Sequence, residues 1–136
     1  MAASFYIVVE GEDPGFDIFV NGHALARYED ALERMAERLH VRPLLEFFSA
    51  DENSMAQLLE QGSGDLEWIH HLPEPQWFAP ADGLLTVRAL LERLENMPAV
   101  LGTETPQIAQ ELHEYERVLR KTALHKLRWH IAVSWR

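Results

Sequence analysis

The feature that most constrains this chain is an alternating segment near its end, residues 127–135, with the sequence LRWHIAVSW. Its large apolar residues occupy every second position: Leu127, Trp129, Ile131, Val133 and Trp135. Side chains of a strand point alternately to its two faces, so this pattern predicts a strand with one face buried. Because a strand does not satisfy its backbone alone, we expect it to join a sheet.

The sheet that receives this strand is expected at the start of the chain. Residues 4–10 (SFYIVVE) and 16–20 (FDIFV) are rich in β-branched and aromatic residues, and the GEDPG between them is typical of a turn. Asn21 and Gly22 offer a second turn, because this pair tolerates positive φ. We therefore predict that one of the two turns closes a β-hairpin.

Apolar residues at helical spacing predict three major helices. The first covers residues 28–39, the second follows the apolar stripe of 87–97 up to Pro98, and the third runs from Thr105 to near His125. Thr105 is the expected N-cap of the third helix. A shorter helix is expected at 54–61, and the segment after Pro43 fits either a strand or a helical turn.

These elements predict one α+β domain over residues 1–136. A chain of 136 residues is long enough to bury a sizeable core without disulfides or a structural metal. We expect a small antiparallel sheet of three or four strands, made from both chain ends and covered by three or four helices.

Composition narrows the classes of function. The chain has no cysteine, which excludes disulfides, thiolate metal sites and cysteine nucleophiles. Its formal net charge of -10 disfavours binding to nucleic-acid backbones. The N-terminal sequence MAASFYIVVEGED has no basic region, and its apolar run is too short for a signal peptide or a membrane span. We expect a cytoplasmic protein without a bound cofactor.

The charges are unevenly distributed along the chain. Residues 1–75 hold 15 acids and 4 Lys or Arg, whereas residues 76–136 hold 7 acids and 8 Lys or Arg. No acid follows Glu116. We expect the basic C-terminal segment to lie beside the acidic N-terminal half in the fold.

The motif HEYER at residues 113–117 is similar in spacing to a zincin motif, in which two histidines four residues apart bind zinc. Here Arg117 occupies the position of the second ligand, and a guanidinium does not bind zinc. The sequence therefore predicts the exposed face of a charged helix, with a surface ion pair between Glu116 and Arg120. His125 and His130 reach His113 only if this helix folds back on the last strand.

The densest chemistry lies in EWIHHLPEPQWF, residues 67–78. The candidate binding residues of this segment are Trp68, His70, His71, Trp77 and Phe78. Neighbouring side chains of an extended segment point in opposite directions, so His70 and His71 are not expected to share a metal. The alternatives are a loop over residues 65–80 that its aromatic residues anchor to the body, and a recognition surface that uses the same residues.

Other signatures are absent from the sequence, which has no G-x-S-x-G elbow, phosphate loop, dinucleotide fingerprint or EF-hand spacing. Neighbouring acids such as Glu29 and Asp30 are expected on polar faces, where they are ionised. No carboxyl group is expected to be buried with a raised pKa.

The stretches VNGHALA, VRPLLEFFSAD and WFAPADGLLTVRALLERL resemble patterns found in small uncharacterised bacterial proteins of unknown function. The resemblance implies no activity and transfers no catalytic residue.

The functional hypothesis is a cytoplasmic, non-catalytic interaction protein that uses the aromatic loop 65–80 and binds a protein partner of basic charge. The alternative is a small metal-dependent or ligand-binding enzyme that uses His70 or His71 with distant His or Glu residues. A homodimer through the last strand or the aromatic loop is a third hypothesis.

Overall fold

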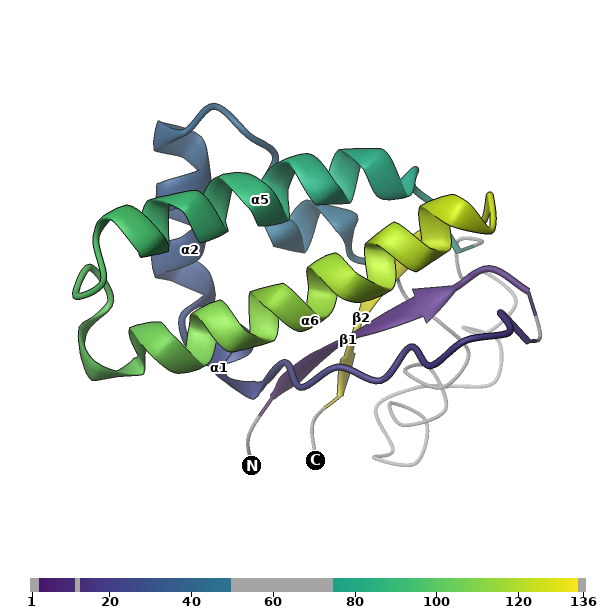
Figure 1. The fold of residues 1–136 in the computed structure, drawn as a ribbon, viewed down its shortest axis with the longest axis horizontal. Coiled ribbons are helices and arrows are strands. Elements are labelled where there is room, and N and C mark those ends of the chain that lie inside the picture. Colours follow the sequence, from purple (N-terminus) through teal and green to yellow (C-terminus); the bar gives the residue numbers. More distant parts are fainter. Residues whose placement is uncertain (1–2, 12, 50–74, 135–136) are drawn as a thin grey trace, which may run out of the picture.

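The computed structural model describes residues 3–11, 13–49 and 75–134. The fold is α+β (Figure 1). Helices α5 (Pro80–Asn96) and α6 (Thr105–Leu124) run antiparallel, side by side, and pack with an antiparallel pair of strands, β1 (Ser4–Val9) and β2 (Trp129–Ser134). The expected pairing of the two chain ends is therefore confirmed.

The register of the two strands places the apolar residues of both on one face. Phe5 lies opposite Val133, and Ile7 opposite Ile131. In β1 every second side chain is buried, and this buried face joins the hydrophobic core. In β2 the prediction of a single buried face is wrong for its first four residues, because Trp129, His130, Ile131 and Ala132 are all fully buried.

The predicted hairpin does not form in the described part of the chain. Residues 16–20 run back beside β1, but they are not a strand, and the next element is the short helix α1 (His23–Arg27). The described residues hold a two-stranded sheet rather than the expected three or four strands. Two isolated bridges, Phe48 to Ile131 and Phe78 to Trp129, extend it on the side of β2.

The major helices lie close to their predicted positions. Helix α2 (Glu29–Arg38) matches the stripe of residues 28–39, and α5 begins seven residues before Val87 because Pro80 supplies its first turn. The segment after Pro43 is a 3₁₀ turn, η1 (Leu44–Phe47), and a second such turn, η2 (Gly102–Glu104), precedes α6. The helix expected at 54–61 lies outside the described residues. Among the helices that the structure describes, none is both long and apolar enough to span a membrane.

The N-cap predicted at Thr105 is not observed. Thr105 is the first residue of α6, and its hydroxyl donates to the carbonyl oxygen of Gly102 at 2.9 Å and accepts from the backbone N–H of Leu101 at 3.1 Å. The side chain therefore closes the preceding turn instead of capping the helix.

The centre of the core is the fully buried indole of Trp129. It stacks on Phe47 at a centroid distance of 5.0 Å, and its Nε1 donates to the carbonyl oxygen of Ala79 at 3.2 Å. Gly83 of α5 lies against it, because a Cβ at this position would come within 2.3 Å of the indole. The missing side chain lets helix and strand approach closely.

Candidate functional site

Among the described residues, a groove of about 760 Å³ lies between β1 and residues 14–20. One wall is β1 itself, from Ser4 to Val9, and the other is formed by Pro14 and residues 17–20. Its volume lies within the range of about 300–1,000 Å³ that is usual for ligand pockets. We define these residues, together with Gly11, His23 and Ser134, as the β1 groove.

Side chains of α6 hold the outer wall of the β1 groove away from β1. Arg117 donates to the carbonyl oxygens of Asp17, at 3.3 Å, and Phe19, at 3.1 Å. The carboxylate of Glu114 accepts from the backbone N–H of Asn21 at 3.0 Å. These bonds supply partners for backbone groups of a segment that does not pair with β1 as a strand.

The HEYER motif of residues 113–117 is thus a clamp on the chain between β1 and α1. The expected exposed helix face is wrong for Tyr115, which is fully buried and whose hydroxyl donates to the carbonyl oxygen of Phe5 at 2.6 Å. Glu116 pairs with Arg88 of α5 at 3.2 Å rather than with the expected Arg120. The motif binds two segments of the N-terminal region through three of its five side chains.

A buried carboxylate that sequence reasoning missed lies one turn earlier. Glu111 is 1% exposed and accepts from the backbone N–H groups of Ala24, at 3.2 Å, and Leu25, at 3.0 Å. These are N–H groups of the first turn of α1, which have no partner within the helix. Glu111 therefore caps α1 from another helix. The available signal was its place on the apolar stripe of α6, between Ile108 and Tyr115.

Gly22 precedes α1 and has no side chain with which to cap it. The expected positive φ is not used, since φ is -130°. The residue is instead required by a close approach, because a Cβ here would lie 1.8 Å from the carbonyl oxygen of Phe5. The N–H of Phe5 donates to the carbonyl oxygen of Gly22 at 3.2 Å. Gly22 thus joins α1 directly to β1.

The pKa of Tyr115 is raised well above its ordinary value, first because burial penalises the charged phenolate and then because the carboxylates of Glu111 and Glu114 repel it. A pKa that is higher in the folded than in the unfolded state stabilises the fold below the unfolded value, about 10, and this stabilisation is lost as the pH rises towards the folded value.

We predict that a Tyr115→Phe variant loses less stability than the parent protein when the pH is raised above about 10. The parent should lose up to about 1.4 kcal/mol of unfolding free energy per pH unit through this group alone. Urea unfolding at a series of pH values measures the difference. Tyr28→Phe is the control, and equal pH dependence of the parent and Tyr115→Phe would contradict the prediction.

The edge of β1 that faces the groove is unpaired at Ile7 and Val9, although these residues are only 2% and 4% exposed. In an antiparallel pair the backbone groups of alternate residues face the partner strand. Glu10 donates its N–H to Arg128 on the β2 side, whereas Phe5 forms its hydrogen bonds with Gly22 and Tyr115 on the opposite side. Ile7 and Val9 lie two and four residues after Phe5, so their backbone N–H and C=O groups point to the same side of β1 as those of Phe5. Within the described residues, no hydrogen-bond partner meets their backbone N–H and C=O groups on this side.

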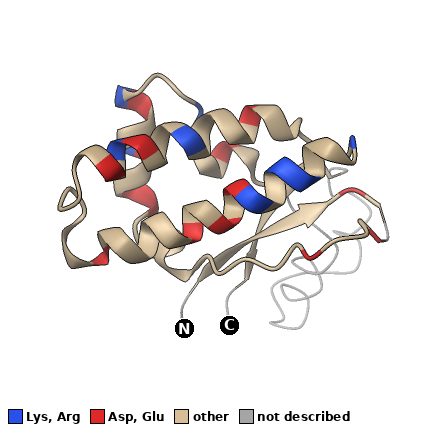
Figure 2. Cartoon of the chain, in the orientation of Figure 1, with Lys and Arg blue, Asp and Glu red and all other residues tan. Residues whose placement is uncertain are grey.

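The described lining of the β1 groove is apolar with one acid. It includes Val8, Ile18 and Phe19, which is 73% exposed, and its acid is Asp17. None of the described lining residues is Lys or Arg. The chain between β1 and α1 carries acidic and no basic side chains (Figure 2). Asp17 forms no ion pair with any described residue, so its carboxylate is available to a cation.

The predicted aromatic site is described only in part. Trp68, His70 and His71 lie outside the described residues. Trp77 stacks on the buried ring of His130 at a centroid distance of 4.3 Å. Phe78 pairs with Trp129 of β2 through two backbone hydrogen bonds, of 2.8 and 3.0 Å. The C-terminal end of the predicted loop is thus anchored to the sheet, on the side opposite to the open edge of β1.

The other histidines that the sequence singled out do not converge. His113 lies 3.9 Å from a carboxylate oxygen of Glu95. His125 stacks on Phe16 at a centroid distance of 4.9 Å. The buried His130 has its Nδ1 2.9 Å from the carbonyl oxygen of Gln76. Each histidine has its own surroundings, and the described residues hold no metal-ligating group that includes one.

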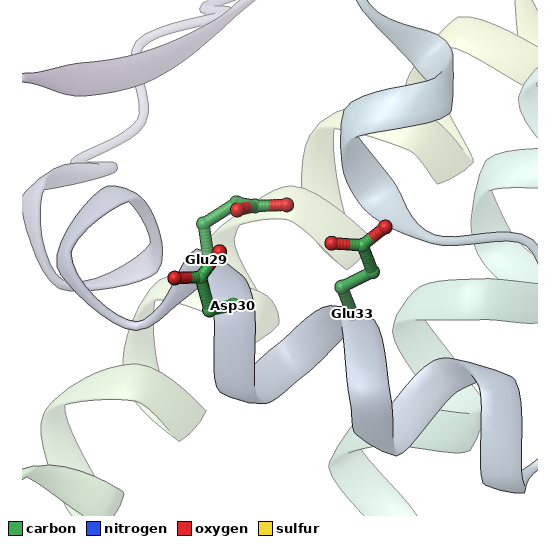
Figure 3. A group of neighbouring side chains, drawn as sticks. All are labelled: Glu29, Asp30 and Glu33. Carbon is green, nitrogen blue, oxygen red and sulfur yellow. The ribbon is translucent and has the colours of Figure 1, made fainter.

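The one group of metal-ligating side chains in the described residues is Glu29, Asp30 and Glu33, whose carboxylate oxygens lie within 4.8 Å of one another (Figure 3). Contrary to the sequence expectation, the pKa of Glu29 is raised, first by burial and then by the neighbouring Asp30 and Glu33. Glu29 and Asp30 lie in the first turn of α2, where the positive end of the helix dipole stabilises acids, and Glu33 lies one turn later.

Contacts across the two halves of the chain follow the charge asymmetry. Arg128, in the basic C-terminal segment, pairs with Glu10 next to β1, and this contact lowers the pKa of the Glu10 carboxyl. Arg117 reaches the acidic connection at Asp17. The basic segment therefore contacts the acidic N-terminal region at Glu10 and at Asp17.

Comparison with models of protein families, with curated proteins and with solved structures finds no match to this chain. The resemblance to small bacterial proteins stays a prediction.

Proposed function

We propose that this protein is a non-catalytic interaction protein that binds an apolar segment of a partner protein in the β1 groove. The observation that carries the proposal is the edge of β1 at Ile7 and Val9, which lines a groove of about 760 Å³ and whose backbone groups have no hydrogen-bond partner among the described residues, although both side chains are buried. Sheet edges with unpaired backbone groups are usually covered or blunted, because they attract other chains. An edge kept open by hydrogen bonds from another helix fits a binding role.

The chemistry of the groove supports a binding role over catalysis. Its described lining holds one acid, Asp17, one histidine, His23, and two serines, Ser4 and Ser134. Among these described residues, no serine is hydrogen-bonded to His23 as a nucleophile is to its base. The proposal includes a cytoplasmic location and a partner of basic charge, in keeping with the net charge of -10 and the absence of cysteine. The contribution of loop 65–80 and the alternative enzyme based on His70 or His71 stay predictions.

Site-specific photo-crosslinking tests the proposal. A photoreactive amino acid replaces Phe19, which lines the β1 groove, or Leu124, which is 80% exposed at the end of α6. In cells that make the protein, we expect a crosslinked partner from position 19 and none from position 124. Both positions are exposed, so neither replacement is expected to cost more than about 0.5 kcal/mol of stability.

The outcome that contradicts the proposal is an equal crosslinking pattern from both positions, or no crosslink at position 19. Sedimentation of the purified protein provides a further check. A homodimer that crosslinks to itself through position 19 would replace the partner with a second copy of this chain.

A further inference from the structure

We propose that the partner segment binds as an added β-strand on the free edge of β1, and that it carries a basic side chain which meets Asp17. This inference rests on the proposed function and specifies the conformation and the charge of the partner. Strand addition is a common mode of peptide recognition, in which backbone hydrogen bonds supply affinity and side-chain pockets supply specificity.

The available edge has a defined length. Pairing starts after Phe5, because its N–H and C=O groups are already bonded to Gly22 and Tyr115. Beyond it, Ile7 and Val9 present their N–H and C=O groups to the groove, and both residues line it. Strand residues rise about 3.3 Å each, so a partner segment of about three to five residues covers this edge.

The side chains that surround this edge select an apolar, extended occupant. Val8 and Tyr6 line the groove from one face of β1, and Ile18 and Val20 line it from the opposite wall. Side chains of an added strand would point alternately to the two faces of the enlarged sheet. A strand with apolar residues at alternate positions would therefore bury them against the lining.

Asp17 gives the site its charge preference. It is exposed, and none of the described residues that line the groove is Lys or Arg. Arg117 donates to the backbone carbonyl oxygen of Asp17 but forms no ion pair with its carboxylate. The Oδ1 atom of Asp17 accepts from the N–H of Phe19 at 2.9 Å, which holds the carboxylate in place. A Lys or Arg of the partner strand is complementary to this fixed acid, and an acidic strand is disfavoured.

A second copy of this chain is a poorer occupant. Its own β1 edge is flanked by residues 16–20, which Arg117 holds through two carbonyl oxygens. Joining two such edges would require both flanking segments to leave their places. It would also bring together two grooves that each carry Asp17 and no cation in their lining, and like charges would repel.

The test uses purified, isotope-labelled full-length protein and synthetic peptides. The probe is acetyl-Val-Lys-Val-Lys-Val-amide, and an otherwise identical peptide has Glu in place of Lys. Two more versions of the Lys peptide carry N-methyl groups, one on the Val residues and the other on the Lys residues. Amide shifts and amide hydrogen exchange at Ile7 and Val9 are recorded during each titration, with Val8, which faces β2, as the internal reference.

Strand addition predicts a specific pattern. The Lys peptide should bind at concentrations up to about 1 mM and slow exchange at Ile7 and Val9 but not at Val8. One set of N-methyl groups faces β1 and should weaken binding at least about tenfold, whereas the other set should have a clearly smaller effect. The Glu peptide should bind about two- to fivefold more weakly than the Lys peptide.

Asp17→Asn isolates the charge. The Asn side-chain oxygen retains an acceptor for the N–H of Phe19, so the loop is preserved, and the preference for Lys over Glu peptides should disappear. Asp82→Asn, an exposed acid in the first turn of α5 outside the groove lining, is the matched control and should keep the preference.

The failures are distinguishable. If a partner crosslinks at position 19 but the Lys peptide leaves Ile7 and Val9 unchanged, or both N-methylated sets bind equally well, strand addition is overturned while the proposed function stands. If no partner crosslinks there, the proposed function fails. Protection of Ile7 and Val9 that grows with protein concentration alone would assign the edge to a second copy and overturn the peptide partner.

Discussion

Replacing Gly22 with Ala is expected to lower the free energy of unfolding by about 3 kcal/mol. The added Cβ would lie 1.8 Å from the carbonyl oxygen, 2.7 Å from the carbonyl carbon and 2.9 Å from the nitrogen of Phe5. All three are backbone atoms of β1, so no side-chain rotation relieves the overlap. Either α1 or β1 must move, and the hydrogen bond from Phe5 to Gly22 is lost. Chemical denaturation measures the change.

Gly15→Ala is the matched control for this variant. A Cβ at Gly15 meets nothing within 4 Å, but φ is +82°, so the variant carries backbone strain without a clash. We expect a loss of about 1 kcal/mol from the left-handed conformation. The two variants separate the two reasons for which a chain requires glycine. Equal losses at both positions would show that the contact between Gly22 and Phe5 is not tight.

A second large effect is expected for Glu111→Leu, which should lose about 3–5 kcal/mol. Leucine is apolar and fits the stripe of α6, but it leaves the N–H groups of Ala24 and Leu25 without acceptors inside the core. Each buried N–H that loses its partner costs about 1–3 kcal/mol. Because whole domains are stable by only about 5–15 kcal/mol, this variant is expected to be marginal at room temperature.

Two further variants separate the loss of the hydrogen-bond acceptor at Glu111 from the effect of introducing a leucine into α6. Glu111→Gln keeps one side-chain acceptor oxygen and should lose less than Glu111→Leu. Gln110→Leu introduces the same residue at the exposed neighbouring position of α6 and should change stability by less than about 0.5 kcal/mol. The capping role of Glu111 would be refuted if Glu111→Leu were as stable as the parent protein, because a Leu side chain accepts no hydrogen bond.

Local periodicity predicted most of the secondary structure. The stripes of α2, α5 and α6 and the alternation of β1 and β2 arise from residues that are near in sequence, and burial of one face selects helix or strand directly. The pairing of the chain ends also followed, since a half-buried strand needs a neighbour and the N-terminus supplied one. In these helices and strands, contacts between residues distant in sequence did not change the secondary structure that the local pattern predicts.

The hairpin prediction was wrong because a distant contact outweighed a local pattern. Residues 16–20 alternate as a strand does, but Arg117, separated by 98 residues from Phe19, donates to its carbonyl oxygen, and the segment is not a strand. A sequence reveals that Arg117 can donate several hydrogen bonds, but not which acceptors lie near it. The β1 groove exists because of this choice, so local pattern alone did not predict it.

The role of the charged residues of α6 shows the same division. The sequence by itself determined that α6 has an apolar stripe and that HEYER lacks the second zinc ligand. Only the tertiary structure decided that Glu111 is buried, that Glu114 and Arg117 hold the chain before α1, and that β1 keeps an open edge. The physical reason is the sequence distance over which each interaction acts. Hydrophobic periodicity depends on residues that are near in sequence, whereas a hydrogen bond joins whichever donor and acceptor the folded backbone brings within about 3 Å.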